Sequence, residues 1–130
     1  MQNRFKFRVW KGQENRMVYD VTYLNPLILD PAIKEENKHN ILMQCTGLKD
    51  KNGKLIYEGD IIDKGTRCKW VVTWFRNRFI LVPDFEYENR DKCVNERVCG
   101  FKYFENNHNY ADRDNEVIGN IYENKELLNE

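Results

Sequence analysis

The sequence predicts a mainly β protein, built as a small barrel-like or strongly curled antiparallel sheet with an N-terminal β-hairpin and a short C-terminal helix. Three observations predict it. Apolar and polar residues alternate with the period of a strand in several short segments. Glycine and asparagine stand where tight turns and corners are needed. Two neighbouring segments are apolar on both faces, which is typical of a closed or curled sheet.

Residues 1–21 are expected to form the N-terminal hairpin. Residues 5–9 alternate apolar with basic side chains, which is the pattern of a half-buried strand. Residues 17–21 repeat the alternation after a polar stretch. Two such runs joined by polar residues favour a β-hairpin.

Residues 22–40 are expected to connect this hairpin to the rest of the chain. Asn25-Pro26 and Asp30-Pro31 are turn signals, and the end of the segment is polar and charge-mixed. Alternatively, Asp30 and Pro31 are the N-cap and first residue of a short helix. Both alternatives place the segment between two parts of one fold.

Residues 41–128 are expected to form the main β region of a single domain that spans residues 1–130. A strand-like run at 41–46 leads to Asn52-Gly53, a pair that accepts the positive φ angles of a tight hairpin turn. The chain then turns a corner at Gly59 before the next strand. Corners of this kind let a small sheet curl.

A second hairpin is predicted from segments 69–75 and 79–82, which are dense in β-forming residues on both faces. The polar residues 76–78 between them indicate the tip of this hairpin. Both apolar faces need cover, from a barrel, a sandwich or an oligomer interface.

The last third of the chain has weaker secondary-structure patterns. Residues 84–115 are polar and charge-mixed, with a weak strand signal at 98–104. Residues 116–122 predict a final strand with a bulge at Gly119. Asn124 is the expected N-cap of the short C-terminal helix.

Composition limits the class of protein. A chain of 130 residues fits one ordinary domain, and 41% apolar residues are too many for intrinsic disorder. The 21 basic and 21 acidic side chains cancel, so no global field directs the protein to nucleic acid or to an anionic membrane, although a local basic patch remains open. Apolar runs are far shorter than the roughly 18 residues that span a bilayer, and no signal-peptide core is visible. A cytoplasmic location without membrane contact is expected.

Cysteines and acidic turns predict neither a metal nor a cofactor. In the cytoplasm, Cys45, Cys68, Cys93 and Cys99 are expected to be reduced thiols, and they form no closely spaced zinc-binding pair. Asp50 begins a segment that resembles a calcium loop, but apolar residues hold the sixth and twelfth positions, where glycine and glutamate are required. A second candidate at residues 112–114 fails because Val117 stands at the position where glycine is required. Both segments are interpreted as Asx turns.

Five sequence blocks, taken in order, resemble the YopX family of phage and prophage proteins. The blocks read FRVW at residues 7–10, MVY at 17–19, LMQCTGLKDKNGK at 42–54, IYEGDII at 56–62 and VIGNIYEN at 117–124. The resemblance covers nearly the whole chain, except for residues 22–40 and 84–115. It implies a small, largely β protein of a bacterial phage or prophage that forms oligomers and has no established activity.

No catalytic constellation is evident, so the chain is not expected to be an enzyme. Glu58 and Asp60 flank Gly59 and could be an acid–base pair only if the glycine did not form a corner. They are interpreted instead as acceptors for backbone N–H groups around the bend. His39 and His108 lie in polar segments without catalytic partners at motif spacing.

One cluster of basic and aromatic residues suggests nucleic-acid binding. Such surfaces combine phosphate contacts with stacking of bases on aromatic rings. The competing interpretation is that the tryptophans fill a core and the arginines occupy an ordinary solvated turn. The cluster consists of Arg67, Lys69, Trp70, Trp74, Arg76, Asn77 and Arg78.

Two functional hypotheses follow. The first is a self-associating structural or regulatory accessory protein of a phage, because one small barrel need not cover both faces of its apolar strands. The alternative is a nucleic-acid-binding small β-barrel protein that uses the hairpin between Arg67 and Arg78. Nothing in the sequence indicates a small-molecule ligand.

Overall fold

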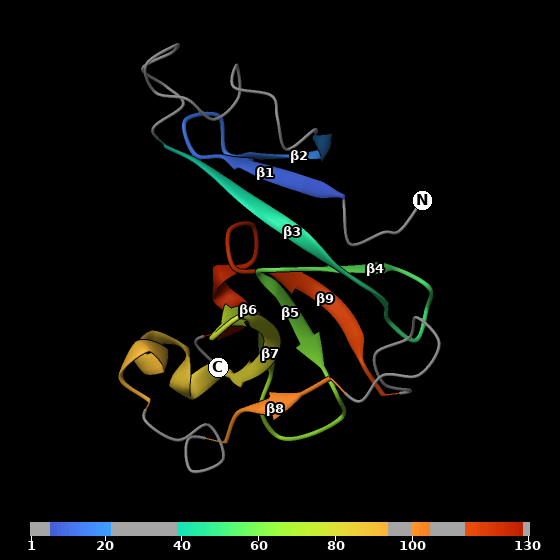
Figure 1. The fold of residues 1–130 in the computed structure, drawn as a ribbon, viewed down its shortest axis with the longest axis vertical. Coiled ribbons are helices and arrows are strands. Elements are labelled where there is room, and N and C mark those ends of the chain that lie inside the picture. Colours follow the sequence, from blue (N-terminus) through green and yellow to red (C-terminus); the bar gives the residue numbers. More distant parts are fainter. Residues whose placement is uncertain (1–5, 22–38, 94–99, 105–113, 129–130) are drawn as a thin grey trace.

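The computed structural model describes residues 6–21, 39–93, 100–104 and 114–128, and it has two antiparallel sheets (Figure 1). The first sheet has the strand order β2-β1-β3-β4, and the second has the order β8-β7-β6-β5-β9. The first sheet consists of β1 (Phe7–Lys11), β2 (Arg16–Val21), β3 (Asn40–Lys49) and β4 (Leu55–Tyr57). The second consists of β5 (Asp60–Asp63), β6 (Trp70–Phe75), β7 (Arg78–Pro83), β8 (Lys102–Tyr103) and β9 (Glu116–Asn120). The mainly β, strongly curled fold predicted from the sequence is confirmed.

The N-terminal hairpin is confirmed as the antiparallel pair β1–β2. Strand β1 also pairs with β3, so the hairpin is extended into a sheet by the first strand of the main region. Strands β3 and β4 then form the hairpin that turns at Gly53, whose φ of 83° agrees with the predicted tight turn. Residues 22–38 of the connecting segment lie outside the described residues.

Strands β6 and β7 form the predicted second hairpin, which pairs without interruption from Trp70↔Pro83 to Phe75↔Arg78. Strand β5 pairs with β6 on one side and with β9 on the other. The register of β5 against β9 shifts by one residue beside Gly119, which confirms the predicted bulge. As Figure 1 shows, the second sheet curls beneath the first.

Both faces of the β6–β7 hairpin pack largely against this chain. Two clusters of buried side chains, one on each face of the hairpin, account for most of its apolar residues. The first contains Ile56, Ile62, Trp70, Val72, Leu81 and Val117. The second contains Phe75, Ile80, Val82, Cys93 and Phe101. Trp74 is the exception, because 49% of its surface remains exposed.

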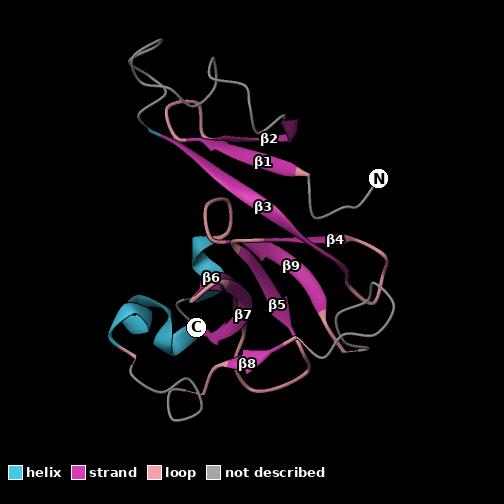
Figure 2. Ribbon diagram, viewed as in Figure 1, coloured by secondary structure: helices cyan, strands magenta, loops and turns pink. Residues whose placement is uncertain are grey.

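The helical segments are short and of the 3-10 type (Figure 2). The predicted C-terminal helix after Asn124 is a single 3-10 turn, η4 (Lys125–Leu128), which corrects the expectation. The Asn124 side chain accepts a hydrogen bond from Asn120 N rather than capping this turn, and four residues are too few to sustain α-helical hydrogen bonding. The longer segment η3 (Asp84–Lys92) was not predicted from the sequence.

The expectation of four reduced thiols is also corrected. Cys93 is disulfide-bonded, whereas Cys45 and Cys68 are free, so the partner of Cys93 lies outside the described residues. Spacing along the sequence tests for metal-binding pairs, but it cannot reveal which thiols folding brings together. In the part of the chain that the structure describes, no helix is both long and apolar enough to cross a membrane.

Candidate binding cleft at the sheet junction

The corner predicted at Gly59 joins the two sheets. Gly59 has a φ of 89°, a conformation that side chains disfavour, and its N–H donates to Val72 O at 2.8 Å. Its carbonyl accepts from Ile121 N at 2.9 Å, while Glu58 N donates to Gln44 O at 2.9 Å. The corner is therefore tied to β3, to β6 and to the turn after β9.

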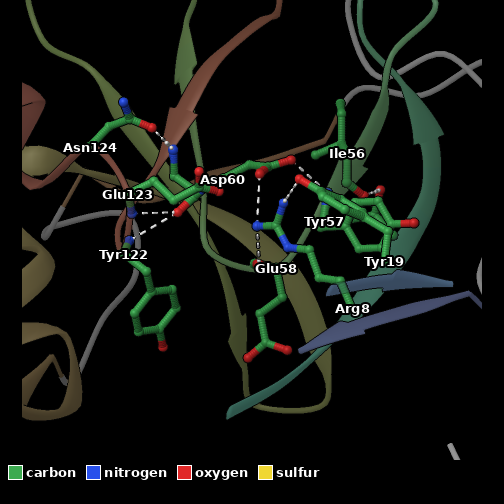
Figure 3. Close-up of polar contacts among 11 residues, drawn as sticks. Arg8, Tyr19, Ile56, Tyr57, Glu58, Asp60, Tyr122, Glu123 and Asn124 are labelled. Atoms are coloured by element: carbon green, nitrogen blue, oxygen red, sulfur yellow. Dashed lines mark hydrogen bonds and ion pairs between the residues drawn. The ribbon is translucent and has the colours of Figure 1, made fainter. Parts of the chain in front are cut away.

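Asp60 points from this corner into the protein, where it pairs with Arg8 of β1 (Figure 3). Arg8 Nη2 lies 2.8 Å from Asp60 Oδ1, and each side chain is only 2% exposed. The other carboxylate oxygen accepts from Tyr57 N at 2.8 Å, and Arg8 Nη2 also donates to Glu58 O at 3.1 Å. The interpretation of Asp60 as an acceptor for a backbone donor is confirmed, and its ion pair links the two sheets.

Two tyrosine rings complete the surroundings of Arg8. The guanidinium carbon lies 4.8 Å from the centroid of the Tyr57 ring and 5.8 Å from that of Tyr19. Burial raises the pKa of Asp60, and the positive charge of Arg8 and the Tyr57 N–H act against that rise. The pair is enclosed and connects β1 of the first sheet to β5 of the second.

A second turn positions Tyr122 beside the corner. Asn120 Oδ1 accepts hydrogen bonds from Tyr122 N at 3.0 Å and Glu123 N at 2.9 Å. Asn124 Oδ1 accepts from Asn120 N at 3.1 Å, which closes the turn. The Tyr122 ring stacks on Trp10 of β1, with centroids 5.6 Å apart. The turn therefore fixes an aromatic ring at the sheet junction.

Beside the buried pair lies a cleft of about 210 Å³. Its walls come from β3, the Gly59 corner, β6, η3 and the turn after β9. Figure 3 shows the Glu58 side chain extending away from Arg8, opposite to Asp60 and in the same direction as the Tyr122 ring. The lining residues are Ile41, Met43, Glu58, Gly59, Val72, Thr73, Trp74, Tyr87, Arg90, Asp91, Ile121 and Tyr122.

The polar groups of the cleft influence one another. Burial raises the pKa of Glu58, against the effects of the Gln44 main chain and of Arg8. Burial also raises the pKa of Tyr122, and the nearby Tyr87 and Glu58 raise it further. The pKa of Tyr87 is raised by burial and then by neighbouring carboxylates that include Glu58, while Arg90 lowers it. Glu58, Tyr87 and Tyr122 all line the cleft, so the carboxylate of Glu58 acts on both phenols.

Arg90 is already engaged within the cleft wall. Its guanidinium carbon lies 4.0 Å from the centroid of the Tyr87 ring, and its Nη1 donates to Tyr87 O at 2.7 Å. Within the described ranges, no group of three or more His, Cys, Asp or Glu side chains could hold a metal ion. The arrangement offers a carboxylate, aromatic faces and an apolar wall, which are groups for binding.

The structure divides the cluster predicted to bind nucleic acid. Trp74, Arg76 and Arg78 lie together at the tip of the β6–β7 hairpin. Arg67 and Lys69 precede β6 at its opposite end, roughly 20 Å away along an extended strand. These five residues therefore do not form one surface.

Individual members of that cluster differ in their surroundings. Trp70 is buried in the core, whereas Trp74 is half-exposed and packs edge-on against Phe79, with centroids 4.8 Å apart. Arg76 donates to Cys93 O at 2.8 Å and lies over the Phe75 ring. The interpretation of the tryptophans as core residues thus holds for Trp70 alone.

Asp50 shows that the calcium-like segment is an Asx turn. Its Oδ1 accepts from Asn52 N at 2.9 Å and Lys54 N at 2.8 Å, which confirms that interpretation. Its Oδ2 also accepts from Val117 N of β9 at 2.9 Å, a long-range contact that no local sequence pattern predicts. Asp112 and His108 lie outside the described residues, and His39 is exposed.

The fold and site together define a class: small proteins of two antiparallel sheets joined through a buried ion pair, with an amphipathic cleft beside it. A family model described as YopX protein matches residues 6–129, so the chain belongs to the YopX family. The two sequence blocks that supply the Gly59 corner and Tyr122 are among those that resemble this family.

Solved structures agree with this assignment. The chain is similar to protein EF1440 from Enterococcus faecalis, with a TM-score of 0.62 and 27% identity over 95% of this chain and 96% of that one. It also shares its fold with protein yopX from Bacillus subtilis, with a TM-score of 0.52 and 18% identity over 95% and 98% of the two chains. A comparison with curated proteins found no match.

Proposed function

We propose that this chain is a non-enzymatic accessory protein of a bacterial phage or prophage that acts by self-association, in a structural or regulatory role. The observation that supports it is a pair of exposed apolar side chains at the cleft. Ile41 of β3 is 40% exposed and Trp74 of β6 is 49% exposed, and both line the same cleft. Large apolar groups gathered at one hollow of a surface are typical of contact sites.

Light scattering over a series of concentrations tests this proposal. Self-association requires a mass above that of the 15.7 kDa monomer, rising with concentration. Trp74→Ser and Ile41→Ser are each expected to weaken association by about tenfold or more, because large apolar anchors carry most of the energy of a contact. A wild-type mass that stays at that of the monomer would refute the proposal.

Phe85 provides the matched control. This residue of η3 is 69% exposed but does not line the cleft. Phe85→Ser therefore removes exposed apolar surface elsewhere and is expected to leave association unchanged. An equal loss in Phe85→Ser and Trp74→Ser would mean that general surface hydrophobicity, not the cleft surface, drives association.

The second candidate function is nucleic-acid binding at the hairpin tip. An exposed Trp74 beside Arg76 and Arg78 supports it, since base stacking needs an accessible ring and phosphates need nearby cations. Arg78→Ala is expected to weaken binding of a single-stranded oligonucleotide, measured by fluorescence anisotropy at low salt. Arg67→Ala, at the opposite end of β6, is the control with the same change of charge. Absence of binding at low salt would exclude this function.

A further inference from the structure

The cleft combines groups that together favour a cation. Trp74, Tyr87 and Tyr122 line the cleft with aromatic rings, which attract positive charge. One face of Tyr87 already holds Arg90, and one face of Tyr122 stacks on Trp10. Glu58 supplies a carboxylate to the same cleft that the two phenols line. Met43 and other apolar residues also line the cleft. Rings, a carboxylate and an apolar wall match an organic cation on an aliphatic stem.

The charges of the cleft also favour a cation. Its ionisable residues include the carboxyl groups of Glu58 and Asp91 and the guanidinium of Arg90. Arg90 is held by the ring and carbonyl of Tyr87, and its one positive charge is outnumbered by the two carboxyl groups. An anion would also face two carboxylates at close range. The arrangement therefore discriminates against negatively charged ligands.

The size of the cleft limits what enters it. At about 210 Å³ it is smaller than the sites of roughly 300 Å³ or more that hold typical small-molecule ligands. A single side chain or a short alkyl amine is of suitable size. Met43, Val72 and Ile121 contribute apolar groups to the lining, on which an aliphatic stem can pack.

We propose that this cleft binds a primary ammonium group on an aliphatic stem, of the kind that a lysine side chain presents. Glu58 pairs with the ammonium group, the rings of Tyr87, Tyr122 and Trp74 surround it, and the stem packs on the apolar wall. This inference goes beyond self-association and does not rest on it. A chain that stays monomeric and still binds the ammonium probe would refute self-association and leave the cleft assignment intact.

Three probes with four carbon atoms each test the assignment on the full chain. They are n-butylammonium, n-butanol and butyrate, titrated at pH 7 and constant ionic strength. Chemical shifts of the Trp74 indole N–H and of the Gly59 and Ile121 amides report binding. Saturable shifts with butylammonium at a Kd on the order of millimolar are expected. Butanol is expected to bind about tenfold more weakly, because it lacks the charge that Glu58 pairs with.

Two variants assign the effect to one carboxylate. Glu58→Gln preserves shape and is expected to reduce butylammonium affinity about tenfold. Glu126→Gln removes the same charge from an exposed residue outside the cleft and is expected to change nothing. The probe series on the wild-type chain gives an answer even if a variant folds poorly.

Several results would overturn the assignment. Equal binding of butanol and butylammonium would make the cleft a purely apolar groove. Preference for butyrate would make Arg90 the anchor of an anion site. Unchanged butylammonium affinity in Glu58→Gln would remove the carboxylate from recognition, and absence of shifts with every probe would mean that the cleft binds none of these groups.

Discussion

Asp60 and Glu58 lie on either side of one glycine, yet they occupy opposite kinds of environment. Asp60 is enclosed, paired with Arg8 and bonded to Tyr57 N. Glu58 is half-buried and lines a cleft with two phenols. The bend at Gly59 directs the Asp60 carboxylate to the buried Arg8 and the Glu58 carboxylate away from it, to the cleft (Figure 3). Carboxylates in the same motif can thus differ in role, because their surroundings decide whether each is paired within the protein or available to a ligand.

The largest loss of unfolding free energy is expected when the buried pair of Arg8 and Asp60 is broken. Arg8→Met leaves Asp60 without its cation in a buried site, which is expected to cost about 3–5 kcal/mol of unfolding free energy. Urea unfolding measures the loss. The double variant Arg8→Met with Asp60→Asn is expected to recover part of it, because the uncompensated charge is gone. A loss below about 1 kcal/mol in Arg8→Met would show that the pair does not hold the sheets together.

Sequence patterns predicted the strands and corners of this protein but not the pair that joins its sheets. Alternation over residues 5–9 assigns Arg8 to the polar phase of a half-buried strand, yet Arg8 is 2% exposed and Val9 is fully buried. Strand β1 is covered on both faces at this point. Alternation of apolar and polar residues indicates that one face of a strand is buried. It does not indicate that a distant segment covers the other face as well.

The cleft was predictable only in part. Glu58 and Gly59 lie in the block that predicts the corner, and Tyr122 lies in the block that predicts the final strand. Tyr87 and Arg90 come from η3, whose polar sequence has no helical or strand periodicity. A 3-10 segment held by tertiary contacts leaves little trace in local sequence, and so most of this wall was missed.

Two glycines with similar φ angles, Gly59 and Gly53, test how tightly the corner is packed. Gly59→Ala is expected to cost about 2–4 kcal/mol, because φ is 89° and the new Cβ would lie 3.1 Å from Met43 Sδ. Gly53→Ala has a similar φ of 83° but no atom within 4 Å of the new Cβ, so about 1–2 kcal/mol is expected. Urea unfolding of both variants separates backbone strain from packing. Equal losses would mean that the corner is not tightly packed at the junction.

The smallest expected effect concerns Glu58 and depends on pH. Its folded-state pKa is raised above 4.5, mainly by burial, so the ionised carboxylate destabilises the fold. The stability this group contributes is complete below pH 4.5 and is lost as pH rises through the folded pKa. Glu58→Gln is therefore expected to unfold at a higher temperature than the wild type at pH 7, and at nearly the same temperature near pH 4. Thermal unfolding at both pH values, with Glu126→Gln alongside, measures the difference.

The sign of this effect links stability to the proposed ligand. A bound ammonium group favours the ionised carboxylate, so binding should lower the pKa of Glu58 and release protons at a pH near its folded value. Calorimetry of butylammonium binding in buffers of different ionisation enthalpy detects that release, and Glu58→Gln should abolish it. If instead the wild type gains stability over Glu58→Gln as pH rises, then the folded protein stabilises the ionised Glu58 by its own contacts, and this carboxylate is not available to a ligand.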